Sequence, residues 1–170
     1  MKYYAGVGSR DAPKDILDFM TQIAEHLEQK GYILRSGHAK GSDQAFEAGV
    51  KLEVNKEIFS SRIASSDEAK EIAASIHPAW HLCSDYAKGC HGRNVYQILG
   101  KDLNTPVSFV ICWTPEGKEI GGTRTAIVLA KRHKIPVYNL ALHKFNSLEE
   151  MLSQLYKMTI STSYRRLRPV

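Results

Sequence analysis

The sequence lacks several features that would place it outside the ordinary globular proteins. Among its 170 residues no apolar run approaches the roughly 20 residues needed to span a bilayer, so we expect no membrane association. Residues 1–6 enter a strand-like stretch directly, without the basic and apolar regions of a signal peptide, so none is expected. No repeat, low-complexity linker or charge block marks a second domain. We therefore predict a single domain over 1–158, followed by a basic tail over 159–170.

Cysteine is scarce, with only Cys83, Cys90 and Cys112. An odd number of thiols in a chain of this size fits reduced cysteines and a cytoplasmic location better than a disulfide framework. Zinc would need ligands with compact spacing, and the chain has no Cys-x-x-Cys pair. We therefore expect neither a metal nor a cofactor, and we interpret the remaining candidates as ordinary side chains: His77, His81, Cys83, Cys90 and His91.

Charge of one sign is not in large excess. The formal net charge of +5 suits an anionic partner, but a solvated basic surface explains it equally well.

Two enzyme signatures are also missing. No Gly-x-Ser-x-Gly elbow supports a serine hydrolase. No glycine-rich segment has the Walker A spacing of an NTPase.

Short β-like runs alternate with longer amphipathic runs along the chain. The pattern predicts strands over 3–7, 32–34, 54–59, 107–113 and 135–140. It predicts helices over 13–31, 45–52, 65–76, 93–99, 121–131 and 147–155, with 77–92 the least regular part. Such alternation implies right-handed crossovers. The expected fold class is a doubly wound α/β fold, with a mostly parallel sheet and helices on both faces. Pro136 fits at the start of the last strand or at an edge.

Three glycine-bearing loops each follow a predicted strand. Glycine lets backbone N–H groups approach a phosphate at a helix N-terminus, and in parallel sheets ligands bind at the carboxyl ends of the strands. Each loop is a weak signal alone, and the first lacks the third glycine of a dinucleotide fingerprint. Together they predict one phosphate site. The loops are Gly6-Val7-Gly8-Ser9-Arg10, Ser36-Gly37-His38-Ala39-Lys40-Gly41-Ser42-Asp43 and Gly121-Gly122-Thr123-Arg124-Thr125.

Arg93 and Asn94 follow a segment with two glycines, 89–92, that we expect to be flexible. An arginine suits a bidentate phosphate contact, and at a predicted helix start it opposes the helix dipole, which favours a functional role. Asp43 is interpreted as a helix cap. The residues predicted to bind phosphate or nucleotide are Gly8, Ser9, Arg10, Ser36, Gly37, Lys40, Gly41, Ser42, Arg93, Asn94, Gly121, Gly122, Thr123 and Thr125.

Taken together, these loops resemble the SLOG superfamily of Rossmann-like proteins, which includes the DNA-processing protein DprA (Smf) and the Lonely Guy (LOG) phosphoribohydrolases. The residues that carry the resemblance are Val7-Gly8-Ser9-Arg10, the run from Ser36 to Ala45, and Gly121 to Ala126 followed by Ile135-Pro136-Val137. The resemblance covers about 3–140 and is closest to small DprA-like proteins often found in phage genomes.

The DprA resemblance implies binding of single-stranded DNA and a role in DNA recombination with a recombinase-type protein partner. Relatives of this fold often pair, which allows a homodimer. Binding of a nucleotide or single-stranded DNA is therefore the first expectation. Single-strand binders stack bases on aromatic side chains, and those available are Tyr3, Tyr4, Trp80, Tyr86, Tyr96 and Trp113.

The LOG resemblance implies a second reading, hydrolysis of the N-glycosidic bond of a nucleoside 5′-monophosphate. Arg93 matches the arginine of LOG enzymes and would be catalytic, and the third loop matches their glycine motif. Asn94 replaces their lysine and Val128 replaces their glutamate. Glu116 or Glu119 could supply a carboxylate instead. A third reading is a protein-interaction role, with the basic segment 164–170 docking a partner.

Overall fold

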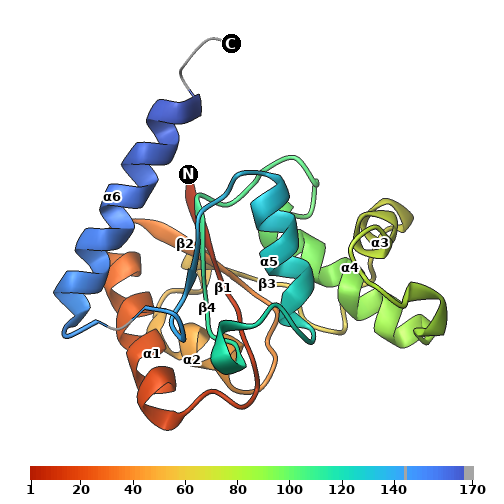
Figure 1. The fold of residues 1–170 in the computed structure, drawn as a ribbon, viewed down its shortest axis with the longest axis horizontal. Coiled ribbons are helices and arrows are strands. Elements are labelled where there is room, and N and C mark those ends of the chain that lie inside the picture. The colour runs from red at the N-terminus through yellow and green to blue at the C-terminus, as the bar shows by residue number, and fades with distance from the viewer. Residues whose placement is uncertain (144, 167–170) are drawn as a thin grey trace.

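The computed structural model of the chain is a three-layer α/β arrangement around one parallel sheet (Figure 1). It describes residues 1–143 and 145–166, with side chains as far as Lys157. Within those residues five strands and six α-helices make up the fold, and this confirms the predicted doubly wound α/β class. None of the helices in the described residues is long and apolar enough to cross a membrane.

The strands lie in the order β3-β2-β1-β4-β5, and every neighbouring pair is parallel. This Rossmann-like order starts in the middle of the sheet and reverses between β1 and β4, whose carboxyl ends border the crevice where such sheets bind ligands. Pro136 immediately precedes the edge strand β5, as predicted. The strand bounds are β1 Lys2–Gly6, β2 Tyr32–Ser36, β3 Lys56–Ile58, β4 Phe109–Cys112 and β5 Val137–Asn139.

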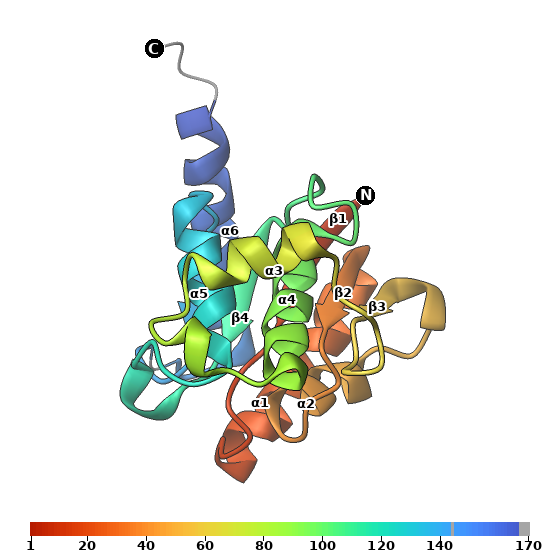
Figure 2. The same ribbon diagram turned by 90° about the vertical axis from the view of Figure 1, so that its right-hand side faces the viewer.

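Successive residues of the central strands are buried in opposite layers, which explains why these strands are apolar almost throughout. On β1, Tyr4 packs into one core cluster and Ala5 into the other, and Phe109 and Val110 of β4 divide in the same way. In the ribbon, α1, α2 and α6 cover one face and α4 and α5 the other, with α3 outside α4 (Figures 1 and 2). The helix bounds are α1 Lys14–Gln29, α2 Ser42–Gly49, α3 Asp67–Ala74, α4 Asp85–Leu99, α5 Thr123–Arg132 and α6 Leu148–Arg166.

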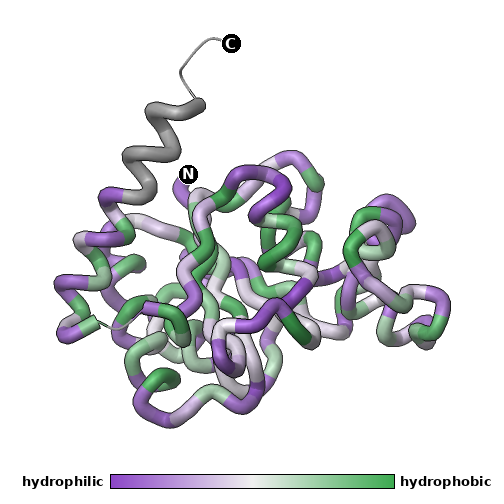
Figure 3. Tube along the Cα trace, in the orientation of Figure 1, coloured by the Kyte–Doolittle hydropathy of each residue, from purple (hydrophilic) through white to green (hydrophobic). Residues whose placement is uncertain are grey.

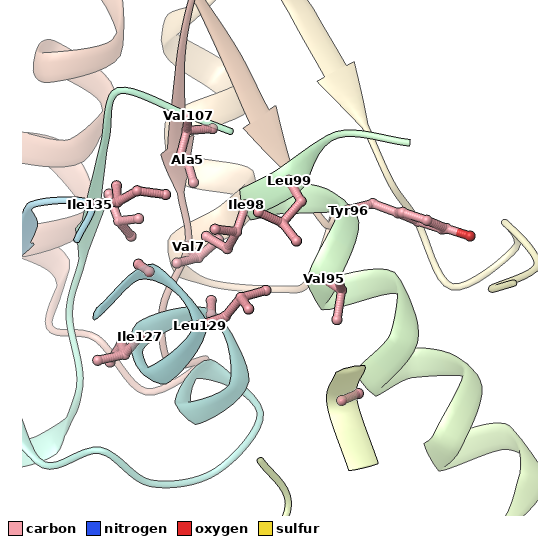
Figure 4. Packing of buried hydrophobic residues seen from close by; sticks show 14 of the residues in the cluster. Ala5, Val7, Val95, Tyr96, Ile98, Leu99, Val107, Ile127, Leu129 and Ile135 are labelled. Carbon is pink, nitrogen blue, oxygen red and sulfur yellow. The ribbon is translucent and has the colours of Figure 1, made fainter. Parts of the chain in front are cut away.

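The helices pack through apolar side chains, α3 against α4 and the others toward the sheet. Hydrophilic and apolar residues alternate along the helices (Figure 3), as expected for helices that cover a core on one side. Between α4, α5 and the sheet, side chains such as Ile98 and Leu129 converge on Ala5 and Val7 (Figure 4). This packing fixes the position of α4 relative to the loops that follow β1 and β4.

Helix α4 begins at Asp85, well before the start at 93 that the sequence pattern predicted. Ser84 caps the helix by accepting the N–H of Ala87, and Gly92 permits close packing, because a Cβ there would lie 2.7 Å from Ser65 Cβ. The prediction of a flexible segment over 89–92 is therefore wrong. Arg93 lies inside a helix rather than at its start, and the dipole argument for it does not hold.

Helix α6 continues to Arg166, beyond the predicted end at 155. The backbone of 159–166, predicted as a basic tail, therefore continues this helix. The rest of the predicted tail, 167–170, lies outside the described residues.

Replacing Gly49 with alanine is expected to destabilise the fold by about 1–3 kcal/mol, as overpacking does. Helices α1 and α2 meet at this glycine, and a Cβ there would lie 2.2 Å from the carbonyl oxygen of Thr21. The matched control is Gly89→Ala in α4, where a Cβ meets nothing within 4 Å and should gain roughly 0.5–1 kcal/mol of helix propensity. Chemical denaturation measures both free energies of unfolding. Equal effects in the two variants would contradict the packing argument.

Candidate functional site

A cleft of about 1260 Å³ lies at the carboxyl ends of the strands, and all three glycine-bearing loops line it. We call it the switch-point cleft. Its walls come from the segments after β1, β2, β3 and β4, together with α4 and the start of α5. The predicted site residues that line it are Gly8, Ser9, Arg10, Gly37, Lys40, Arg93, Asn94, Gly121, Gly122, Thr123 and Thr125.

Three predicted site residues do not line the cleft and instead hold the loops in place. The Ser36 hydroxyl donates to Glu47 Oε1 at 2.7 Å, and the Ser42 hydroxyl donates to the carbonyl oxygen of Ser9 at 2.7 Å. Gly41 has φ +83°, and a Cβ there would lie 2.7 Å from the carbonyl oxygen of Arg10. Only glycine meets both conditions at low cost. The second loop is thus tied to α2 and to the first loop.

Asp43 organises the second loop from within. Its Oδ2 accepts the backbone N–H of Gly37 at 3.1 Å and that of Ala39 at 3.4 Å. Burial raises the pKa of the Asp43 carboxyl from its ordinary 3.8 to about 6, although these two N–H groups and the charge of Arg93 act in the opposite direction. A carboxyl group that changes charge close to neutral pH therefore lines the cleft.

Helix α4 links the second and third loops through two consecutive side chains. Arg93 Nη1 donates to the carbonyl oxygen of Gly37 at 2.7 Å. Asn94 Nδ2 donates to the carbonyl oxygen of Gly122 at 3.1 Å. Because α4 is packed into the core, it holds the two loops at a fixed separation across the cleft.

The charge of the cleft is mainly positive. Its lining includes two carboxylates, Asp11 and Asp43, against five cations, Arg10, Lys40, Arg62, Arg93 and Arg124. The Nε atoms of Arg93 and Arg124 are buried and have no hydrogen-bond partner in the described part of the chain. A buried donor without a partner costs roughly 1–3 kcal/mol, so an anion that lets either guanidinium turn and complete its bonds is favoured.

The N-terminus of α5 adds uncharged donors. The backbone N–H groups of Gly122 and Thr123 make no hydrogen bond to any described residue. They lie where the positive end of the helix dipole meets the cleft. Free N–H groups in this position are suited to phosphate oxygens.

Sequence reasoning missed several lining residues. Arg62 follows β3 with no nearby motif, and Arg124 belongs to the third loop without forming part of its glycine and hydroxyl pattern. The sequence indicates Asp43 as a helix cap, but no side chain caps α2, whose N-cap is Gly41. Tyr86, 70% exposed, is the aromatic candidate that lines the cleft. Among the described residues the other candidates lie elsewhere, in the core or against neighbouring side chains: Tyr3, Tyr4, Trp80, Tyr96 and Trp113.

The fold also brings together three of the five residues for which the spacing predicted no metal site. One ligand atom from each of His77, Cys83 and His91 lies within 4.8 Å of the others. His91 Nδ1 lies 3.3 Å from Thr125 Oγ1, and burial, His77 and Arg93 together lower the pKa of the His91 imidazole. His81 and Cys90 are not part of this cluster.

The carboxylate that a LOG-type reaction needs is not supplied where the sequence suggested. Val128 packs against the core, while Glu116 pairs with Lys118 and Glu119 with Lys131. None of these three residues is among those that line the cleft.

The fold and the cleft define the chain as a Rossmann-like α/β protein with a basic cleft at the topological switch point. No protein-family model, curated protein or solved structure matches it.

Proposed function

We propose that this chain binds nucleotide phosphate in the switch-point cleft, as a free nucleotide or as part of a single DNA strand. The observation that carries the proposal is the convergence of three glycine-bearing loops and five cationic side chains on one cleft. Backbone donors and guanidinium groups are the partners that phosphate oxygens use most in proteins. A fold that gathers both at a switch point has the chemistry for this ligand.

The parts of the cleft suggest how the ligand lies. The phosphate would be held by the N-terminus of α5 together with Arg93 and Arg124, and Tyr86 offers a face for a base. The volume of about 1260 Å³ exceeds the roughly 300–1,000 Å³ of ordinary small-ligand pockets, which leaves room for more than one nucleotide unit. Of the aromatic candidates in the described residues, Tyr86 lines the cleft. The affinity for a nucleotide is therefore expected to depend chiefly on its phosphate.

The resemblance to DprA-like members of the SLOG superfamily supports the same ligand. It also supports a place in DNA recombination, with a recombinase-type partner and a homodimeric assembly. These wider proposals depend on the resemblance alone. The phosphate proposal also has the charge and geometry of the cleft behind it.

The first test compares nucleotides with their nucleosides in thermal unfolding. A 5′-nucleotide at a hundred times its dissociation constant should add about 2.7 kcal/mol of stability. For a chain of this size that corresponds to a rise in Tm of roughly 5–10 °C. The matching nucleoside, which has the same base and sugar without the phosphate, should have almost no effect. Equal shifts for both would contradict a phosphate site.

Fluorescence anisotropy with a labelled oligothymidylate tests the single-strand form. The logarithm of the binding constant should fall by roughly 0.7 for each contacted phosphate per unit of log salt. Binding of the oligonucleotide but of no mononucleotide would assign the cleft to DNA. Binding of neither would overturn the proposal.

A second candidate, hydrolysis of a nucleoside 5′-monophosphate, is favoured by one observation, the raised pKa of Asp43 in the cleft. A protonated Asp43 would donate its proton to the leaving base as the C1′–N bond breaks, and the water that bonds to C1′ would return a proton to the Asp43 carboxylate. Chromatography of the nucleotide incubations distinguishes this reaction from binding alone. Released base that Asp43→Asn abolishes without loss of nucleotide binding would establish the candidate, and intact nucleotide would exclude it.

A further inference from the structure

Two imidazoles and one thiol meet beside the switch-point cleft. His77 follows α3, Cys83 follows the short turn Trp80–Leu82, and His91 lies on α4. Cys83 Sγ is 3.7 Å from His77 Nε2, and the His77 and His91 ring centroids are 4.6 Å apart at 67°. All three side chains are half-buried, and the three ligand atoms lie within 4.8 Å of one another.

This set of donors matches one class of ion. Nitrogen and sulfur ligands select zinc and similar transition metals, whereas magnesium and calcium need oxygen ligands. Zinc bonds of about 2.3 Å to sulfur and 2.0–2.1 Å to nitrogen place tetrahedral neighbours roughly 3.5 Å apart. The His77–Cys83 separation of 3.7 Å is already close to this value. The other separations are at most 4.8 Å, so an inward shift of roughly 1 Å by the side chains completes the geometry.

Neighbouring groups act differently on the two rings: the partner of His91 favours coordination, whereas the partner of His77 must release its bond. Thr125 Oγ1 lies 3.3 Å from His91 Nδ1 and can accept its proton, which leaves the Nε2 lone pair for a metal. The backbone N–H of Ala79 donates to His77 Nδ1 at 3.1 Å. Coordination through His77 Nε2 moves the ring proton to Nδ1. The hydrogen bond from Ala79 is then lost, and a bond from Nε2 to the metal replaces it. The Cys83 thiol contacts the carbonyl oxygen of Ala79 at 3.7 Å and His77 Nε2 at the same distance, so its sulfur already lies beside a ring that would share the metal.

We propose that His77, Cys83 and His91 form a zinc-class metal site whose fourth position opens toward the switch-point cleft. His77 and His91 line the cleft, whereas Cys83 is not among the lining residues. Three protein ligands with one open position is the arrangement in which a zinc ion also takes a water or a substrate oxygen. The site stands on its own geometry and does not depend on the proposed function.

Cobalt titration of the full chain, after removal of metal with a chelator, tests the site directly. One equivalent of Co²⁺ should produce visible d–d bands of tetrahedral type and a near-ultraviolet thiolate-to-cobalt band, and Zn²⁺ should abolish both. Cys83→Ser should remove the thiolate band and weaken Zn²⁺ binding at least tenfold by calorimetry. His91→Ala should remove the tetrahedral bands.

The matched controls are Cys90→Ser and His81→Ala, which change the same residue types outside the cluster. Both should bind Co²⁺ and Zn²⁺ as the unaltered chain does. Absence of a tetrahedral spectrum in the unaltered chain would overturn the proposal. Equal loss of metal binding in Cys83→Ser and Cys90→Ser would overturn it as well, because it would indicate adventitious binding to any thiol.

Discussion

Replacing Arg93 with alanine is expected to weaken nucleotide binding by about ten- to a hundredfold, because a charge-assisted hydrogen bond to an anion contributes roughly 1.5–3 kcal/mol. Arg93 lines the cleft and also donates to the carbonyl oxygen of Gly37, so alanine removes both a phosphate partner and a support of the second loop. Arg93→Lys retains the charge without the planar fork and should bind with intermediate affinity. Calorimetry with a 5′-nucleotide gives the dissociation constants.

Arg132→Ala is the matched control for this variant. Arg132 also lies on a helix and donates two hydrogen bonds, to the hydroxyl and the carbonyl oxygen of Ser75, but it does not line the cleft. Its loss should lower stability and leave nucleotide affinity unchanged. If Arg93→Ala is folded and binds the nucleotide as tightly as Arg132→Ala does, the phosphate is not held by Arg93.

The sequence pattern was sufficient to predict most of the fold. Glycine marks the ends of β1 and β2, where Gly8 follows the first strand and Gly37 the second. The apolar run that forms β4 is buried on both sides, as its composition predicted. The prediction is wrong at the first turns of α4, because Gly89 and Gly92 indicate a flexible segment when only the local sequence is considered. In the structure Gly92 makes space for Ser65, a tertiary contact that no local pattern reveals.

The loops of the candidate site could be predicted from the sequence, but which of their side chains face the cleft could not. Serine, glycine and lysine before a helix indicate phosphate binding, but they do not show which donors turn inward. Ser42 donates to the neighbouring loop instead, while Asp43 beside it lines the cleft. The His77, Cys83 and His91 cluster was not predicted, because a turn and a helix bring together residues whose spacing matches no metal motif.

Replacing Asp43 with asparagine is expected to raise the free energy of unfolding at pH 7 by up to about 3 kcal/mol, since one pKa unit corresponds to 1.36 kcal/mol. The pKa of the carboxyl is 3.8 ordinarily and about 6 in the folded chain, chiefly because of burial. The folded chain therefore binds this proton more tightly than the unfolded chain does. The protonated Asp43 carboxyl therefore contributes its full stabilisation of the folded chain below pH 3.8, and this contribution is lost as the pH rises through 6. Asparagine keeps an oxygen for the N–H groups of Gly37 and Ala39 but carries no buried charge.

Urea denaturation at a series of pH values from 4 to 8 measures this effect as a difference between the variant and the unaltered chain. The difference should grow in favour of Asp43→Asn as the pH rises. Asp102→Asn is the control, because the N–H of Asn104 and the hydroxyl of Thr105 lower the pKa of that exposed carboxyl below its ordinary 3.8. Asp102 therefore stays ionised across this pH range, and the difference for Asp102→Asn should be almost constant with pH. If the difference in the free energy of unfolding between Asp43→Asn and the unaltered chain is constant with pH, burial does not raise the pKa of the Asp43 carboxyl. If the variant is more stable and binds nucleotide less well, the chain keeps a costly buried charge at the cleft because ligand binding requires it.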